Sequence, residues 1–387
     1  MDISQAIEQI SRGTTEIINL DGLEKKLQAS QNNKKPLHIK AGFDPTAPDI
    51  HLGHVVLLRK LRQFQNLGHE IYFLIGDFTA QIGDPSGRDQ KRVKMGRAQI
   101  EKNARTYKEQ VFKILNPKKT KIVFNSAWLD RLKPQELLEL TSSSSVAQML
   151  ARADFKKRFE EKAEISLLEF IYPLLQGYDS IHLKADVELG GSDQKFNLLM
   201  GRQLQEMHKQ DPQVVIMTPL LIGLDGTQKM SKSFNNYVGI NEPPKEMFGK
   251  LMSMSDELMP TYFELLTDFN LQEMKLLHPK EAKLKLAQNI VSQFWGVKSA
   301  QEAREYFEKT FSQKQIPEDI QEYKLREKDS TLKEILVDDT KIISSARELG
   351  RMLTQGAVTF NGQRIDEKWQ PKAGVLKIGK RRFLKLG

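Results

Sequence analysis

The sequence predicts an α/β fold: a doubly wound parallel sheet with a helical insertion, followed by an α-helical domain and a small basic α/β module. Three observations lead to this expectation. A strand, a helix and a second strand follow one another over residues 36–78. After residue 243 the chain becomes strongly helical and charged. The last 57 residues carry twelve Lys and Arg against six Asp and Glu.

The first strand–helix–strand unit explains where a site should lie. Residues 36–44 are β-rich and end in a turn, and residues 55–69 carry apolar side chains at helical spacing, with Gly68 as the expected C-cap. Residues 70–78 form a continuous apolar strand, and a second unit is expected around residues 214–224. Ligands bind beyond the carboxyl ends of the strands in such sheets, so the loops after these strands should carry the functional residues.

The remaining segments define the domain boundaries. A helical insertion is expected over about residues 98–189, because its segments carry long apolar faces. The predicted domains are 1–242 for the sheet domain, 243–325 for the helical domain and 331–387 for the basic module, with a polar linker at 311–330. Within the module we expect a helix over 345–355 and strands over 358–362, 375–380 and 381–386.

Composition limits the possible functions. The 387-residue chain can bury a large core, and its lack of cysteine excludes disulfides, thiolate nucleophiles and thiolate zinc sites. It shows neither an apolar run of the ~20 residues that a membrane helix needs nor a secretory signal, so we expect a cytoplasmic protein without a membrane partner. Of the net charge of +9, +6 lies in residues 331–387, which fits either a polyanion contact or a solvated lysine-rich face.

The stretch His51-Leu-Gly-His54 stands at the start of the predicted helix. Its two imidazoles are three residues apart and therefore share one helix face, next to the free backbone N–H groups that make a helix N-terminus an anion site. Gly53 leaves room for a flat ring against the backbone. Two purely structural histidines would give the same spacing. No metal site is expected, because a third ligand of clear spacing is lacking.

A second stretch, Lys229-Met-Ser-Lys-Ser233, follows a predicted strand and turn. Its two lysines offer mobile positive charge suited to a polyphosphate. Together with His51-Leu-Gly-His54, it resembles the two signatures of class I aminoacyl-tRNA synthetases. Alone, the stretch could equally be a basic surface loop.

A third set of residues narrows the resemblance. Tyr172, Gln176 and Asp179 lie at i, i+4 and i+7, one polar stripe on an otherwise apolar helix, which either faces solvent or needs buried partners. With "GGSDQ" at 190–194 and "IGDPSGR" at 82–88, the pattern resembles bacterial tyrosyl-tRNA synthetases over nearly the whole chain. The resemblance implies a Rossmann-like catalytic domain with a dimerising insertion and an S4-like RNA-binding tail.

The resemblance also implies a role for each matching residue. For tyrosine, Asp179 would accept a hydrogen bond from the phenol, Tyr172, Gln176 and Asp84 would hold the α-ammonium, and Gln194 would face the substrate. The groups implied in catalysis on ATP are His51, His54, Thr46, Lys229, Lys232, Arg88 and Arg92. Further ATP contacts are implied for Gly42, Asp44, Gly53, Gly191, Asp193, Met230, Ser231 and Ser233. Arg347, Arg351, Lys377, Lys380, Arg381 and Arg382 would contact RNA.

By resemblance, the substrates would be ATP with Mg²⁺, L-tyrosine and tRNA(Tyr), and the chain would form a homodimer. Two positions depart from the family pattern: Lys40 replaces the tyrosine with which many relatives contact the substrate hydroxyl, and Leu57 stands where some carry a polar residue near the ribose. Two alternatives remain open at this point, a tryptophanyl-tRNA synthetase and a non-catalytic synthetase-like RNA-binding protein.

Overall fold

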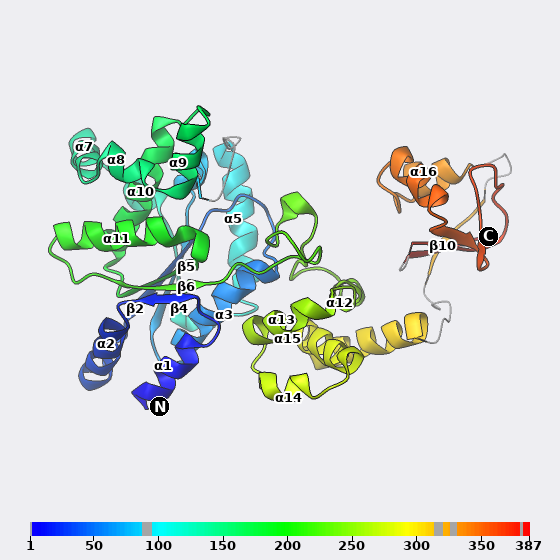
Figure 1. Ribbon diagram of the computed structural model, residues 1–387, viewed down its shortest axis with the longest axis horizontal. Helices are drawn as coiled ribbons and strands as arrows, with labels where there is room; N and C mark the ends of the chain where they lie inside the picture. The colour runs from blue at the N-terminus through cyan, green and yellow to red at the C-terminus, as the bar shows by residue number, and fades with distance from the viewer. Residues whose placement is uncertain (1, 87–94, 313–319, 326–330, 380–381) are drawn as a thin grey trace. The chain divides into compact units, whose positions relative to one another are not determined.

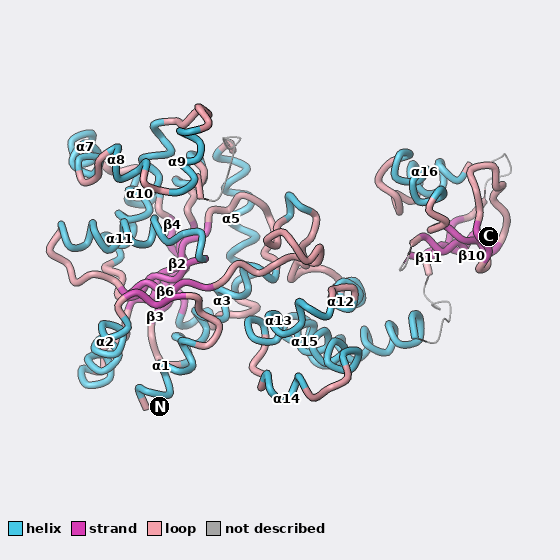
Figure 2. Tube along the Cα trace, viewed as in Figure 1, coloured by secondary structure: helices cyan, strands magenta, loops and turns pink. Residues whose placement is uncertain are grey.

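The computed structural model describes residues 2–86, 95–312, 320–325, 331–379 and 382–387 (Figure 1). The chain divides into two compact units, Met1–Ala300 and Gln301–Gly387. Each unit contains one β-sheet, shown in magenta in Figure 2.

The sheet of the first unit has the order β1-β6-β5-β2-β3-β4. All neighbouring strands are parallel except β1, which pairs antiparallel with β6. The predicted strands over 36–44 and 70–78 are confirmed as β2 and β3, which pair with His38 opposite Glu70 and Phe43 opposite Ile75. The strands are β1 (Glu16–Ile18), β2 (His38–Phe43), β3 (Glu70–Ile75), β4 (Thr120–Phe124), β5 (Val187–Gly191) and β6 (Val214–Thr218).

Helices cover both faces of this sheet, as the doubly wound prediction requires. Figure 1 shows α10 and α11 on one face and α1, α2 and α3 on the other. Helix α3 ends before Gly68, whose positive φ of 98° is the left-handed conformation expected of a C-cap glycine. These helices are α1 (Ile3–Ser11), α2 (Leu20–Asn33), α3 (Leu52–Asn66), α4 (Thr79–Ile82), α5 (Arg97–Val111), α10 (Leu167–Leu183) and α11 (Lys195–Met207).

The expected helical insertion over 98–189 needs a correction. Strand β4 lies inside this interval and forms the edge of the sheet beside β3, and β5 begins at Val187. None of the five residues of β4 is buried, so the strand lacks the apolar continuity that marks the central strands. The rest of the interval is helical, with α6 (Ser126–Leu129), α7 (Pro134–Ser142), α8 (Val146–Leu150) and α9 (Ala153–Glu160), which pack with α10 and α11 around a common apolar core.

The predicted helical region after residue 243 is confirmed. Its last helix changes direction at Gly296, where φ is 81° and ψ is 164°, at the glycine that ends the predicted apolar segment. The helices are α12 (Pro244–Met252), α13 (Met259–Leu266), α14 (Leu271–Lys275) and α15 (Pro279–Phe307). None of the helices in the described ranges is long and apolar enough to cross a membrane.

The second unit is a small α/β structure with a sheet of order β7-β11-β10-β8-β9. Its predicted helix and three strands are confirmed as α16 (Ala346–Thr354), β8 (Val358–Phe360), β10 (Gly374–Ile378) and β11 (Arg382–Leu386). The linker prediction needs a correction, because β7 (Gln321–Tyr323) lies within 311–330 and pairs in parallel with β11. A π-helix (Glu334–Asp339) and β9 (Gln363–Arg364) complete the unit, and its apolar core includes Ile335, Leu336, Leu376 and Leu384.

Candidate functional site

A cavity of about 640 Å³ lies beyond the carboxyl ends of β2, β5 and β6. It brings together every residue predicted for tyrosine or ATP that the structure describes. Lys40 and Leu57 also line it. Arg88 and Arg92 lie outside the described residues. The predicted residues on its wall are Gly42, Asp44, Thr46, His51, Gly53, His54, Asp84, Tyr172, Gln176, Asp179, Gly191, Asp193, Gln194, Lys229, Met230, Ser231, Lys232 and Ser233.

The two histidines build the start of α3 as well as the cavity wall. His51 is the N-cap: its Nδ1 accepts from the Gly53 N–H at 3.2 Å, while His54 Nδ1 accepts from the His51 N–H at 3.2 Å. The two ring centroids are 3.9 Å apart. Since both Nδ1 atoms accept, each neutral ring carries its proton on Nε2 and has that donor left for a ligand.

The same geometry explains Gly53. A Cβ at this position would come within 2.9 Å of the His51 ring, so the glycine provides space for that imidazole.

The histidines are held neutral. Burial lowers the pKa of His51 to about 2, with smaller contributions from His54 and Lys232. Burial, followed by Lys232, lowers the pKa of His54 to about 4. Both rings can therefore donate a hydrogen bond to a phosphate oxygen at neutral pH without adding a charge of their own.

The loop of Lys229–Ser233 lies against the histidine segment. Ile222 and Lys229 form a β-bridge, and the Met230 N–H donates to the Leu221 carbonyl at 2.7 Å, which fixes the loop to the segment after β6. Lys229 Nζ pairs with Asp193 Oδ2 at 3.1 Å, and Lys232 Nζ pairs with Asp49 Oδ2 at 2.5 Å.

Asp179 lies at the inner end of the cavity on α10 and is 2% exposed. Trp128 Nε1 donates to its Oδ1 at 2.8 Å and Asn125 Nδ2 donates to its Oδ2 at 3.3 Å. Burial nevertheless raises the pKa of Asp179 from 3.8 to about 7, against the lowering effects of Lys40, Trp128 and Asn125. The polar stripe on α10 thus faces the protein interior.

Three of the other predicted tyrosine contacts, Tyr172, Gln194 and Asp84, are hydrogen-bonded beside it. Tyr172 Oη donates to Asp44 Oδ2 at 2.9 Å, and Thr79 Oγ1 donates to Asp44 Oδ1 at 2.8 Å. Gln194 Nε2 donates to Asp84 Oδ2 at 2.8 Å. These carboxylates and amides form a polar wall that can hold an ammonium group.

Sequence reasoning missed the residues that support this wall. Asn125 and Trp128 follow β4, whose carboxyl end opens on the same edge of the sheet as β2 and β3. Had residues 120–124 been recognised as a strand, the rule that placed the other site residues after strand ends would have found both. Glu188, which lies on β5 and pairs with Lys40, and Asp49, which pairs with Lys232, carried no comparable signal.

The predicted RNA contacts lie on the second unit. Arg347 and Arg351 are exposed on α16, Lys377 is exposed on β10, and Arg382 is exposed on β11, where it donates to the Ile342 carbonyl. Lys380 and Arg381 lie outside the described residues.

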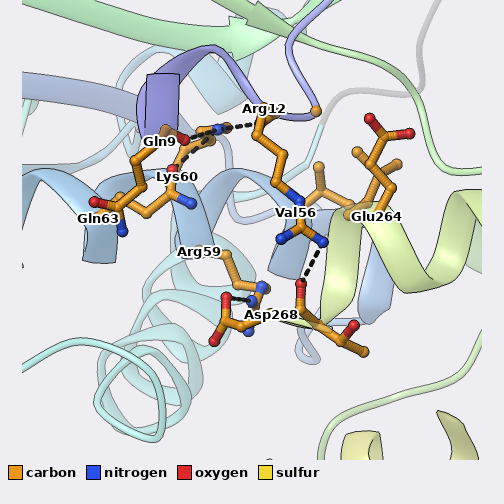
Figure 3. Close-up of a pocket in the computed structure, with 11 residues that line it drawn as sticks. Gln9, Arg12, Val56, Arg59, Lys60, Gln63, Glu264 and Asp268 are labelled. Atoms are coloured by element: carbon orange, nitrogen blue, oxygen red, sulfur yellow. Dashed lines mark hydrogen bonds and ion pairs between the residues drawn. The ribbon is translucent and has the colours of Figure 1, made fainter. Parts of the chain in front are cut away.

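A second cavity of about 220 Å³ lies between the N-terminal segment, α3 and the end of α13 (Figure 3). Its basic side chains are engaged with the protein: Lys60 Nζ donates to the Ile10 carbonyl at 2.6 Å and Arg12 donates to the Phe269 carbonyl at 2.8 Å. Arg59 pairs with Asp268. We interpret the residues around this cavity as structural contacts that hold the helical segment after β6 against the sheet domain.

The architecture and the two signature loops define a class I tRNA synthetase. Residues 31–312 match the family described as tRNA synthetases class I (W and Y). The chain is 51% identical over 400 residues to a tyrosine–tRNA ligase of Geobacter metallireducens, covering 100% of this chain and 99% of the relative. It is 50% identical over 397 residues to that of Aquifex aeolicus, with 100% and 99% covered. The chain belongs to this class I family and, within it, to the bacterial tyrosyl-tRNA synthetases.

Solved structures share the fold at lower identity. A C-terminally truncated mitochondrial tyrosyl-tRNA synthetase of Coccidioides posadasii superposes with a TM-score of 0.64 at 24% identity, covering 79% of this chain and 91% of that one. A tyrosyl-tRNA synthetase of Archaeoglobus fulgidus complexed with L-tyrosine gives a TM-score of 0.62 at 23% identity, covering 78% and 100%.

Proposed function

We propose that this chain is a tyrosine–tRNA ligase, which activates L-tyrosine with ATP and transfers it to the 3′-terminal adenosine of tRNA(Tyr). One observation carries the proposal: the histidine segment, the Lys229–Ser233 loop and the buried carboxylate of Asp179 all line one cavity. The full-length likeness to proteins named tyrosine–tRNA ligase supports the same assignment.

In this proposal, Asp179 selects tyrosine. Its carboxylate already accepts from Trp128 and Asn125 and has lone pairs left for a phenolic O–H. Phenylalanine would leave this buried carboxylate without that partner, a mode of discrimination for which tyrosyl-tRNA synthetases are the standard example. Tyr172, Gln176 and Asp84 would hold the α-ammonium, and Gln194, hydrogen-bonded to Asp84, would face the same substrate.

Activation needs no protein nucleophile. The tyrosine carboxylate attacks the α-phosphorus of ATP, a P–O bond forms, and the bond to the pyrophosphate oxygen breaks, so negative charge grows on the leaving group. His51 and Thr46 would reach the γ-phosphate, His54 and Gly53 would lie under the nucleoside, and Asp193 would contact the ribose. Lys229 and Lys232, with Arg88 and Arg92, would stabilise the pyrophosphate as charge develops. Mg²⁺ would arrive with the triphosphate, since it is bound mainly by phosphate oxygens and water.

The S4-like RNA-binding module, predicted over 331–387, would lie within the second unit, following the predicted helical domain 243–325 and catalytic domain 1–242. Its exposed arginines and lysine, Arg347, Arg351, Lys377 and Arg382, suit phosphate and shape recognition of folded RNA, together with Lys380 and Arg381. Transfer of tyrosine to the ribose hydroxyl would then depend mainly on positioning.

A homodimer would form through the α7–α10 segment, which exposes several large apolar side chains. Leu138, Val146, Phe159 and Leu167 are each more than 60% exposed. A surface segment that exposes several large apolar side chains is typical of a protein–protein interface.

ATP–pyrophosphate exchange with tyrosine, tryptophan and phenylalanine tests the proposal against its alternatives. We expect exchange with tyrosine alone. Exchange with tryptophan alone would favour a tryptophanyl-tRNA synthetase. Asp179 argues against that enzyme, because its buried carboxylate is placed to accept a hydrogen bond from a phenol. No exchange with any amino acid would favour a non-catalytic RNA-binding role, against which the complete phosphate-binding loops argue.

A further inference from the structure

Lys40, one of the two residues expected to depart from the family pattern, is fully buried at the base of the cavity. It lies on β2 with an exposed fraction of 0%. Its ammonium pairs with Glu188 Oε1 on β5 at 2.9 Å, and donates to Ser180 Oγ at 2.8 Å and to the Gln176 carbonyl at 3.0 Å on α10. The three donor positions of the ammonium are therefore all used within the protein.

Glu188 completes this network from the neighbouring strand. It is 1% exposed, its Oε2 accepts from Ser180 Oγ at 3.0 Å and from Gln213 Nε2, and its Oε1 receives Gln176 Nε2 at 3.4 Å. The pair consequently joins two strands to the face of α10 that carries Gln176 and Asp179, both of which line the cavity.

Lys40 and Glu188 are also the charged groups that act on the Asp179 carboxylate, with opposite effects. Lys40 lowers the pKa of Asp179 and Glu188 raises it, the lysine more strongly. Two other titratable groups, Asp44 and His182, are connected to Asp179 through neutral side chains. Asp44 is separated by Thr79 and Asn125, which form a chain of hydrogen bonds from Asp44 to Asp179. His182 stacks on Trp128, with ring centroids 4.4 Å apart.

We propose that the buried Lys40–Glu188 pair is the positioning element of the tyrosine pocket in this chain. It holds the inner face of α10 in register with the sheet, and the ammonium of Lys40 favours the ionised form of the Asp179 carboxylate, which accepts the phenolic hydrogen bond. This inference rests on the proposed role of Asp179 in tyrosine selection.

The test is the pH profile of kcat/KM for tyrosine in ATP–pyrophosphate exchange, which reports the ionisation of the free enzyme. The full-length wild type is compared with Lys40→Met, Glu188→Gln and the double variant Lys40→Met/Glu188→Met. Lys40→Met should move the acid limb to higher pH, with about a tenfold loss for each pH unit of displacement at a pH below the limb. Glu188→Gln should move the acid limb to lower pH. The acid limb of the double variant should lie between those of the wild type and of Lys40→Met.

A matched control removes a buried cation from another ion pair that contacts α10. Arg158, 1% exposed, pairs with Glu169 of α10 at 2.5 Å. Arg158→Met should lower the melting temperature as a broken buried pair does, but leave the acid limb in place. If Lys40→Met does not fold, Glu188→Gln and the double variant still give opposite displacements.

The outcomes separate this inference from the proposed function. Displacements of opposite sign for Lys40→Met and Glu188→Gln support the inference, because simple loosening of the pocket would shift both the same way. An acid limb that stays unmoved in both variants overturns it, provided that Asp179→Asn abolishes the preference for tyrosine over phenylalanine. If Asp179→Asn keeps that preference, the proposed role of Asp179 fails first, and this inference fails with it.

Discussion

Replacing Asp179 with Asn should make the first unit more stable at alkaline pH, even as it removes the carboxylate that is proposed to accept the phenolic hydrogen bond. Because burial raises the pKa of Asp179 above its ordinary value, the folded protein binds a proton at this site more tightly than the unfolded chain does. Ionising the group therefore opposes folding. Its cost is absent below pH 4, grows as the pH rises, and is complete above pH 7.

The size of the effect follows from the pKa. A rise from 3.8 to about 7 corresponds to about 4 kcal/mol of unfolding free energy. The asparagine cannot ionise, so it avoids this cost. It also places an amide NH₂ among the donors of Trp128 and Asn125, a pH-independent loss of ~1–3 kcal/mol. The pH-dependent part of the difference between the two proteins is thus the quantity to measure.

The assay is urea unfolding followed by tryptophan fluorescence from pH 4 to pH 8.5. The chain has three tryptophans, and Trp369 belongs to the second unit. In a Trp369→Phe background, Trp128 and Trp295 report on the first unit alone. Other titrating groups, including the histidines whose pKa values burial lowers, contribute equally to both proteins and cancel in the difference.

We expect the unfolding free energy of Asp179→Asn, relative to its parent, to increase by about 4 kcal/mol between pH 4 and pH 8. A difference that is independent of pH would refute the reasoning, because it would mean that Asp179 ionises as easily in the folded state as in the unfolded chain. A decrease over the same pH range would mean that the hydrogen-bond donors Trp128 and Asn125 lower the pKa of Asp179 by more than burial raises it.

Four further predictions address the rest of the molecule. Alanine at His51 or Lys232 should lower the single-turnover rate of adenylate formation by at least tenfold and leave tyrosine affinity, measured by equilibrium dialysis, nearly unchanged. Deleting residues 331–387 should preserve pyrophosphate exchange and impair tRNA charging; loss of both would place the tail in the catalytic core. Leu167→Glu should shift the sedimentation coefficient toward that of a monomer, whereas an unchanged value would exclude the α10 N-terminus from a dimer interface. Lys60→Met should destabilise the first unit by ~1–3 kcal/mol in urea unfolding, since it leaves buried carbonyls without their donor; an unchanged midpoint would show that water replaces the ammonium.

Sequence reasoning succeeded where strand and helix periods were strong and where the site follows strand ends. The continuous apolar run at 70–78 and the helical spacing at 55–69 both corresponded to real elements, β3 and α3. Because parallel strands place their carboxyl ends on one edge, residues as far apart in the chain as His51 and Lys232 could be expected in the same cavity.

The sequence alone did not predict which side chains on different strands and helices contact one another. The pairing of Lys40 with Glu188 depends on the register of β2 against β5, in which Lys40 lies directly opposite Glu188. Neither residue carries a local signal of this register, since a charged residue in a strand is usually solvent-facing. Strand β4 was missed for a related reason, because an edge strand whose residues are all at least partly exposed lacks the apolar continuity of the central strands.

The two signature lysines each have a carboxylate partner within the protein, Asp193 for Lys229 and Asp49 for Lys232. In the proposed function, a triphosphate would exchange places with these two carboxylates, and few mobile ions would leave when it binds. The affinity for ATP should accordingly change less with ionic strength than two unpartnered cations would suggest. Each lysine would also return to a waiting acidic partner once pyrophosphate departs, which favours its release.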